Sequence, residues 1–261
     1  MPLSSVFDKI DLERYSRQLP MIGARGQIDL ASSTVAVVGL GGLGSLVSYY
    51  LAAAGVGKIL LIDGERIELN NLNRQILYST RDVGEWKAEV AAQRLRELNP
   101  DIDIEPVRTE ISADNVNRIL GEADVIVDGL DDWRARLVLD EYSQKTGKPL
   151  VHGAVDGFYG QMTVIVPGKT PCLACIAPKD LGYRGCRAAL GAAVGLVAVL
   201  EALDTIKLLT RIGNPAIGRL LIIDAFNSRI EEITLKPVEC GRCMERIVEA
   251  QDLGLKPEKP A

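Results

Sequence analysis

Short apolar runs alternate with segments of helical periodicity from Thr34 to about Ala154. Valine, isoleucine and leucine dominate the runs, which is typical of strands buried on both faces of a parallel sheet. The pattern predicts strands at residues 34–38, 58–62, 102–107, 124–128 and 149–154, and helices at residues 45–54, 85–98, 112–120 and 133–146. This regular β-α alternation predicts a Rossmann-like α/β fold with a doubly wound, mostly parallel sheet.

The pattern changes after Pro167. Residues 167–185 are rich in glycine, proline and cysteine and are expected to form an irregular crossover loop. Residues 188–209 are mostly apolar and predict a long buried helix. Further strands are predicted at residues 160–166, 220–224 and 230–235, and the last two are expected to form an antiparallel pair near the C-terminus.

These elements predict a single domain over residues 1–250. Its first half spans about residues 30–155, and the crossover loop, buried helix and terminal strands span about residues 156–245. A charged, amphipathic segment from Asp8 to Gln18 is expected to form a helix before the first strand. Residues 251–261 carry lysine, proline and glutamate and are expected to be a disordered tail.

Charge and hydropathy exclude two classes of partner. The net charge of −5 and the lack of a dense basic block disfavour nucleic-acid binding. Residues 1–10 lack the apolar region of a signal peptide, and the weakly polar run at residues 188–200 is too short to span a bilayer. We therefore expect a soluble, cytoplasmic protein with neither a nucleic-acid nor a membrane partner.

A glycine-rich turn, Gly39-x-Gly41-Gly42-x-Gly44, joins the first predicted strand to the following helix. Such a turn lets backbone N–H groups approach a phosphate at the positive end of the helix, although glycines at this place also serve close packing. Asp63 ends the second strand, where an acidic side chain can hold a ribose hydroxyl. The turn and Asp63 predict a nucleotide site but do not distinguish NAD from ATP.

Arg74, Lys87 and Asp131 favour ATP. Cations and a carboxylate near the phosphates have no purpose in hydride transfer. An enzyme that promotes attack on the α-phosphate needs them, because positive groups neutralise the phosphoryl oxygens and a carboxylate holds Mg²⁺. Taken singly, Lys87 could instead be a surface residue of a helix, and Asp131 could be a helix N-cap.

The combined motifs resemble those of the ubiquitin-activating-like adenylyltransferases. This family includes the sulfur-carrier adenylyltransferases of molybdopterin and thiamine synthesis and the small activating enzymes of ubiquitin-like modifiers. The resemblance extends from about Leu12 to Cys243 and makes the chain a single adenylation domain with its ATP-binding half first. It rests on Arg14-Tyr15-Ser16-Arg17-Gln18, the glycine turn, Asp63, Asn71-Leu72-Asn73-Arg74-Gln75, Gly84-x-x-Lys87 and Asp131-Asp132.

The resemblance implies a role for each motif in binding ATP and Mg²⁺. Gly39, Gly41 and Gly42 would line the phosphate loop, Asp63 would hold the ribose, Asn71, Arg74 and Lys87 would contact the phosphates, and Asp131 would bind magnesium. Arg17 would reach the ATP site of the neighbouring subunit of a homodimer. The implied substrate is a small β-grasp protein that ends in Gly-Gly, and a separate sulfurtransferase or conjugating enzyme is a further expected partner.

Two pairs of cysteines, Cys172-x-x-Cys175 and Cys240-x-x-Cys243, have the spacing of a closed tetrahedral zinc site. Two disulfides or four separate buried thiols are the alternatives, and the resemblance supports structural Zn²⁺. Cys186 is the fifth cysteine and precedes the long apolar helix, where the helix N-terminus and neighbouring arginines could lower the pKa of its thiol. It could equally be a packing residue, but the resemblance aligns it with a catalytic cysteine.

His152 is the only histidine in the chain and lies at a strand end. A packing or hydrogen-bonding role is favoured over general base catalysis, which disfavours a Ser-His-Asp hydrolase.

The sequence thus predicts ATP-dependent adenylation of the C-terminal glycine of a ubiquitin-like or sulfur-carrier protein, followed by thioester formation or sulfur transfer. The alternatives are an NAD(P)-dependent oxidoreductase and a non-catalytic scaffold of the same fold. The residues expected to carry catalysis are Arg17, Arg74, Lys87, Asp131 and Cys186.

Overall fold

The computed structural model describes residues 12–177, 188–236 and 240. Within them an eight-stranded sheet has the order β3-β2-β1-β4-β5-β6-β7-β8. The strands from β1 to β5 are parallel, and β6, β7 and β8 continue the sheet in antiparallel pairing. The strands are β1 (Thr34–Val38), β2 (Lys58–Ile62), β3 (Asp103–Val107), β4 (Val125–Asp128), β5 (Leu150–Asp156), β6 (Tyr159–Ile165), β7 (Arg219–Asp224) and β8 (Arg229–Thr234).

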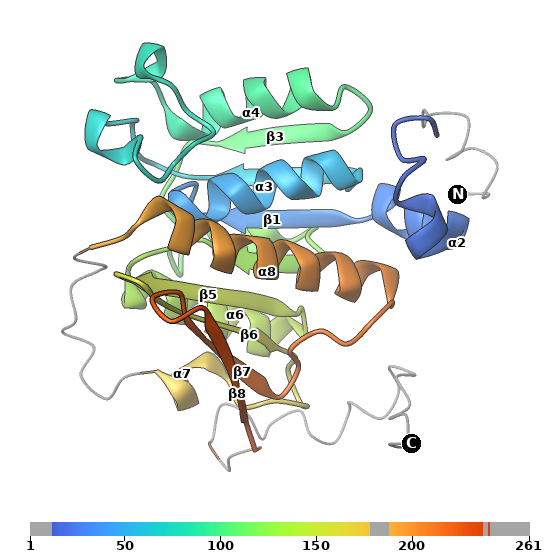
Figure 1. Ribbon diagram of the computed structural model, residues 1–261, viewed down its shortest axis with the longest axis vertical. Coiled ribbons are helices and arrows are strands. Elements are labelled where there is room, and N and C mark those ends of the chain that lie inside the picture. Colours follow the sequence, from blue (N-terminus) through green and yellow to red (C-terminus); the bar gives the residue numbers. More distant parts are fainter. Residues whose placement is uncertain (1–11, 178–187, 237–239, 241–261) are drawn as a thin grey trace.

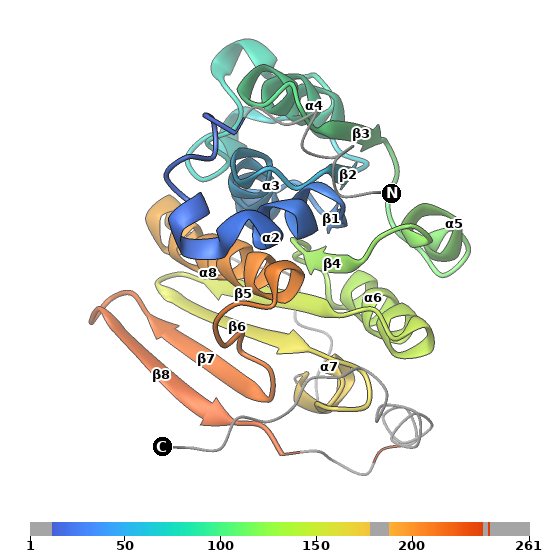
Figure 2. The same cartoon turned by 90° about the vertical axis from the view of Figure 1, so that its right-hand side faces the viewer.

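Helices cover both faces of the sheet (Figures 1 and 2). One face carries α2 (Leu19–Ala31), α3 (Gly42–Ala54), α4 (Lys87–Leu98) and α8 (Gly191–Thr210), and the other carries α5 (Val116–Leu120), α6 (Trp133–Thr146) and α7 (Leu173–Ile176). Single turns of 3₁₀ helix occur at η1 (Leu69–Asn71) and η2 (Thr80–Asp82). No helix in the described ranges is long and apolar enough to cross a bilayer.

The continuous apolar character of β1 follows from this layering. Successive side chains point to opposite faces of a strand, so Val35 and Val37 enter the core under α3 and α8, and Ala36 and Val38 enter the core under α6. The predicted mixed fold, with parallel strands followed by antiparallel ones, is confirmed.

The helix predicted from Asp8 to Gln18 is absent from the described part of this range. Residues 12–18 form turns instead of a helix, and residues 8–11 lie outside the described ranges. Tyr15 is buried against Gly55 at the end of α3, and the Arg14 guanidinium donates to the carbonyl of Leu98. These tertiary contacts fix the segment, and the helix forms afterwards, as α2.

Two smaller differences lie in the loops. Helix α3 begins at Gly42, three residues before the predicted start, so the end of the glycine turn forms the first helical turn. The predicted crossover loop contains the short helix α7, and its residues 178–185 lie outside the described ranges.

Glu201 of α8 is a buried acid. It is fully buried, and neither oxygen of its carboxyl group has a hydrogen-bond partner among the described residues. Its carboxyl group occupies the space where a side chain at position 153 would begin, so Gly153 of β5 has to be glycine. Burial raises the pKa of Glu201 well above its ordinary value, and the nearby Asp128 carboxylate adds to this effect.

Three glycines hold the loops after β1 and β4 together. Gly39 has φ of 86° and follows β1. A Cβ atom at Gly44 would lie 1.9 Å from the Gly39 carbonyl oxygen, and one at Gly129 would lie 2.4 Å from the same atom. The adjacent strands β1 and β4 lead to connections in opposite directions, so this contact lies at the topological switch point of the sheet, where α/β proteins bind ligands.

We predict that Gly44→Ala will lower the melting temperature strongly, because the new methyl group overlaps the Gly39 carbonyl group. Overpacking of this kind costs about 1–3 kcal/mol or more. The matched control is Gly41→Ala in the same turn, where the nearest atom to a new Cβ is 3.7 Å away. Thermal unfolding followed by circular dichroism measures both, and equal melting temperatures for the two variants would contradict the packing role of Gly44.

Candidate active site

A cavity of about 1400 Å³ opens at the carboxyl ends of the parallel strands. Typical ligand cavities measure about 300–1000 Å³, so this one has room for a nucleotide and part of a second substrate. It is lined by the glycine turn, the ends of β2 and β4, the loop through Asn71 and Arg74, and the β5–β6 hairpin. The cavity therefore brings together Gly39, Gly41, Gly42, Asp63, Asn71, Arg74, Lys87 and Asp131.

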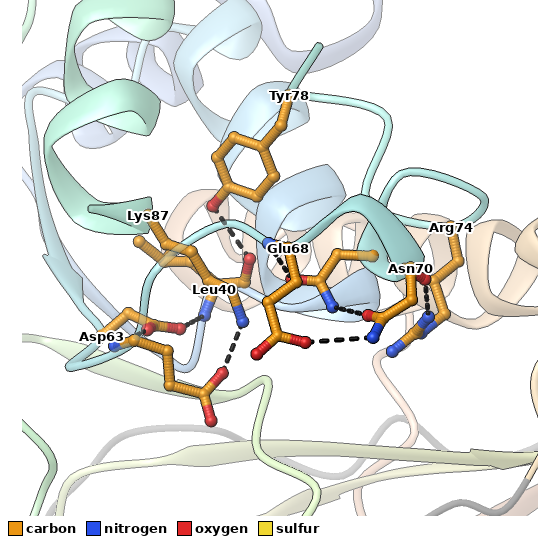
Figure 3. Close-up of polar contacts among 9 residues, drawn as sticks. Leu40, Asp63, Glu68, Asn70, Arg74, Tyr78 and Lys87 are labelled. Carbon is orange, nitrogen blue, oxygen red and sulfur yellow. Dashed lines mark hydrogen bonds and ion pairs between the residues drawn. The ribbon is translucent and has the colours of Figure 1, made fainter. Parts of the chain in front are cut away.

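Asp63 fixes the glycine turn to the end of β2. Its Oδ2 accepts the backbone N–H of Leu40 at 2.7 Å (Figure 3). Its Oδ1 accepts the backbone N–H of Glu65 at 2.7 Å. Burial raises the pKa of the Asp63 carboxyl, while Lys87 and the two backbone N–H groups oppose this shift. Each carboxylate oxygen has capacity for a further hydrogen bond, so Asp63 can also accept one from a ribose hydroxyl.

Tyr78 secures the same peptide from the other side. Its hydroxyl donates to the carbonyl of Leu40 at 2.9 Å, and the ring is buried (Figure 3). Burial raises the pKa of the Tyr78 hydroxyl well above its ordinary value. Both polar groups of Leu40 are therefore held, which keeps the turn in one conformation. The sequence pattern contains no signal for this contact.

Arg74 and Lys87 give the cavity positive charge. The Arg74 guanidinium donates to the carbonyl of Asn70 at 3.0 Å and to the side chain of Asn73 at 3.2 Å, and it forms no ion pair with a described carboxylate. The ammonium of Lys87 lies 2.5 Å from the Glu65 carboxylate. Only 3% of Lys87 is exposed, so the alternative of a surface helix residue is wrong.

Asn71 shapes the loop that presents Arg74. Its side-chain oxygen accepts the backbone N–H of Glu68 at 3.0 Å, and its amide nitrogen donates to the side chain of Asn70 at 2.7 Å. Asn71 is buried and lines the cavity. It thus has a structural role in the loop besides its place in the cavity.

Asp131 and Asp132 have different roles. Asp132 caps α6, because its carboxylate accepts the backbone N–H of Ala135 at 3.0 Å. The alternative reading of Asp131 as the N-cap is therefore wrong. Asp131 is exposed in the cavity and makes no hydrogen bond or ion pair with another described residue. Its oxygens have the chemistry that Mg²⁺ prefers.

A buried polar chain lies beside the cavity. The His152 Nδ1 lies 2.7 Å from Oδ2 of Asp128, and Nε2 lies 3.3 Å from the amide nitrogen of Gln161. The Arg136 guanidinium is 3.4 Å from the same Asp128 oxygen and also donates to the carbonyl of Leu130 at 2.5 Å. Burial lowers the pKa of His152, and the Asp128 carboxylate only partly offsets this. The hydrogen-bonding role expected for His152 is confirmed.

Three of the four paired cysteines form a cluster. The sulfur atoms of Cys172 and Cys175 are 3.5 Å apart, and that of Cys240 lies 3.9 Å from the first and 3.3 Å from the second. A tetrahedral zinc ion with Zn–S bonds of about 2.3 Å separates its sulfurs by about 3.8 Å. The three sulfurs therefore fit one metal ion. Cys243, the fourth predicted ligand, lies outside the described residues.

The structure leaves Cys186 untested and places Arg17 outside the cavity. Cys186 lies outside the described residues. Arg17 is exposed and does not line the cavity. Its neighbour Gln18 donates to the carbonyl of Ala54, at the C-terminal end of α3, whereas the glycine turn lies at the N-terminal end of this 13-residue helix. That helix is about 20 Å long, so Arg17 lies far from the turn of its own chain.

The chain is similar to known proteins over most of its length. The model of the ThiF family matches residues 15–243. The SAMP-activating enzyme E1 of Haloferax volcanii is 39% identical over 249 residues, which are 91% of this chain and 91% of that protein. The sulfur carrier protein adenylyltransferase of Thermus thermophilus is 39% identical over 240 residues, 87% of this chain and 89% of that protein.

A solved structure is also similar to this chain over most of its length. The crystal structure of E. coli MccB with ATP aligns with this chain with a TM-score of 0.80 and 27% sequence identity. The alignment covers 88% of this chain and 74% of the MccB chain. The family match and the two relatives each extend over most of the sequence. The chain belongs to the ThiF family.

Proposed function

We propose that the protein uses ATP to adenylate the C-terminal glycine of a small β-grasp protein that ends in Gly-Gly. The observation that carries this proposal is the cavity, which combines the glycine turn, Asp63, the buried Lys87, an exposed Asp131 and an Arg74 that forms no ion pair with a described carboxylate. The names of two relatives, an activating enzyme and a sulfur carrier protein adenylyltransferase, support the same reaction class.

In the proposed reaction, a carboxylate oxygen of the terminal glycine attacks the α-phosphorus of ATP. A bond forms between this oxygen and phosphorus, and the bond to the bridging oxygen of pyrophosphate breaks. Arg74 and Lys87 would stabilise the negative charge that passes to the leaving pyrophosphate. Asp131 would hold Mg²⁺, which neutralises phosphate charge when bound.

No general base is required, because a carboxylate is already ionised at neutral pH. This agrees with the burial of His152, the only histidine, behind Asp128 and Gln161. The NAD(P)-dependent oxidoreductase gains no support from the family match, and it leaves the cavity cations without a purpose.

A sulfur nucleophile would then attack the acyl-adenylate and release AMP. Cys186 is the candidate within this chain and would give a thioester, whereas a persulfide from a separate sulfurtransferase would give a thiocarboxylate. A separate conjugating enzyme would accept a thioester. Thiolate chemistry of either kind fits a reducing, cytoplasmic compartment.

We expect Arg74→Ala and Lys87→Ala each to lower ATP–pyrophosphate exchange by about 10²–10³, the usual cost of losing one preorganised charge. Exchange is measured with a β-grasp carrier protein ending in Gly-Gly. Arg25→Ala and Lys145→Ala are matched controls, since both side chains form exposed ion pairs outside the cavity and their loss should leave exchange unchanged. Near-normal exchange in Arg74→Ala or Lys87→Ala would remove that residue from the site.

We also propose that Cys172, Cys175, Cys240 and Cys243 hold structural zinc. The close approach of three of these sulfurs supports this. The backbone N–H groups of Leu173 and Ala174 donate to the two carboxylate oxygens of Asp140 on α6 at 2.9 and 3.0 Å. The bound metal would therefore tie the C-terminal segment to a helix that also borders the cavity.

The protein is expected to contain about one zinc ion per chain, and removal of zinc by a chelator should lower the melting temperature, because a structural zinc site contributes to folding. Elemental analysis of protein purified without chelators measures the content. Zinc-free protein, or Cys172 and Cys240 recovered in disulfides, would contradict the proposal.

The position of Arg17 supports a homodimer in which each subunit completes the site of the other. Arg17 is exposed near the C-terminal end of α3, away from the cavity of its own chain. A two-fold interface is isologous, so each subunit would give one arginine and receive one. Exposed apolar side chains of α3 and α8, Tyr49, Tyr50, Leu196 and Leu203, would be covered in such a dimer.

Arg17→Ala should abolish adenylation, and mixing it with Lys87→Ala should restore part of it. A mixed dimer would contain one site that lacks both groups and one intact site. Random mixing makes about half of the dimers mixed, so activity should return to about a quarter of the wild-type value. A monomer in solution, or no recovery after verified subunit exchange, would show that Arg17 does not act in the partner's site.

A further inference from the structure

The amide group of Gln161 has a fixed orientation. Gln161 belongs to β6, is half-buried and lines the cavity. Its amide nitrogen faces Nε2 of His152, and no described residue donates to its Oε1. The chain from Asp128 through His152 to Gln161 therefore ends at the cavity in an unused acceptor.

The direction of the hydrogen bonds follows from Asp128. Its Oδ2 faces the Arg136 guanidinium at 3.4 Å and therefore acts as an acceptor, so Nδ1 of His152 carries the proton and donates to this oxygen at 2.7 Å. In the neutral ring, Nε2 is then an acceptor, and Gln161 must direct its NH₂ group toward it. The carbonyl end of the amide is left for the cavity. Burial of the ring, which disfavours the imidazolium, maintains this arrangement even though the carboxylate of Asp128 is close.

Gln161 lies at the opposite end of the cavity from Asp63. The sheet order places β1, β4 and β5 between β2, which ends at Asp63, and β6, which carries Gln161. Four strand spacings separate them by about 19 Å. With the ribose at Asp63 and the phosphates over the glycine turn, Gln161 would lie on the side from which the acyl group arrives. Ala154, Asp156 and Tyr159 line this same end.

We infer that Gln161 binds the C-terminal peptide of the carrier, with its Oε1 accepting the N–H of the last peptide group. This inference rests on the function proposed above and identifies the contact that positions the terminal carboxylate. A glycine tail has no side chain, so its peptide N–H is the donor nearest the reacting group. His152 is a positioning residue, because it acts by holding the amide of Gln161. Correct placement of the carboxylate contributes to rate by fixing it for in-line attack.

The test measures, by calorimetry, the affinity of the full chain for three ligands. The first is 5′-O-sulfamoyladenosine, which lacks a peptide. The second carries Gly-Gly on its sulfamate and mimics the acyl-adenylate. The third is the matched depsipeptide, in which an ester oxygen replaces the N–H of the terminal peptide group. The wild-type protein should bind the second ligand about tenfold more tightly than the third, as expected for one hydrogen bond.

Gln161→Met, which keeps the length of the side chain but removes the acceptor, should bind the second and third ligands equally. Its affinity for 5′-O-sulfamoyladenosine should match that of the wild type. Equal discrimination by wild type and variant, or no discrimination by the wild type, would overturn the role of Gln161 and leave adenylation intact. Weaker binding of 5′-O-sulfamoyladenosine by the variant would place Gln161 at the nucleotide instead. A wild-type protein that binds none of the three ligands would refute the proposed function itself.

The tautomer of His152 can be measured in the wild-type protein, without a variant. His152 is the only histidine, so a ¹⁵N spectrum of the imidazole contains one residue. A neutral ring protonated on Nδ1 is expected at about pH 7. An imidazolium, or a ring protonated on Nε2, would turn the amide of Gln161 and contradict the inference.

Discussion

The close contact of three glycines around one carbonyl oxygen determines the arrangement of the site. The Gly39 carbonyl lies where side chains at positions 44 and 129 would begin, so the loops after β1 and β4 approach each other only because these residues lack a Cβ atom. The contact sets the start of α3 and the path of the loop that carries Asp131. Asp63 and Tyr78 then hold Leu40 between them and make the turn rigid. These backbone positions therefore form the cavity, and the charged side chains line it.

The polar interior connects the two halves of the sheet. Asp128 ends the parallel strand β4, His152 belongs to β5, and Gln161 belongs to the antiparallel strand β6. Arg136 joins Asp128 to the loop that carries Asp131. Charges inside a protein are costly unless they are paired. Here the pairing of Asp128 with His152 also orients Gln161, and the pairing of Asp128 with Arg136 also holds the loop that carries Asp131. The charged cluster thus connects the loop that carries Asp131 to Gln161 on the other side of the cavity.

The sequence predicts those features that depend on local pattern. Apolar runs placed the central strands within one or two residues, and the glycine turn, Asp63 and the paired cysteines were recognised by spacing. Residues 12–18 do not form the predicted helix, because Tyr15 and Arg14 are held by contacts with residues far along the chain. No local pattern marks Glu65, Tyr78 and Gln161 as site residues, for a similar reason. Their partners, Lys87, Leu40 and His152, are brought near by the fold, and no periodicity records such contacts.

The buried acid on α8 couples folding to proton uptake. In the unfolded chain Glu201 has an ordinary pKa near 4.5, whereas in the folded protein the pKa is raised. Between these two values the unfolded chain has lost the proton and the folded chain keeps it, so folding binds one proton. The contribution to the free energy of unfolding is complete below the lower value and falls by about 1.4 kcal/mol for each pH unit above it, until the folded pKa is passed. A rise in pH above the unfolded value therefore acts on this protein through its core as well as through its surface.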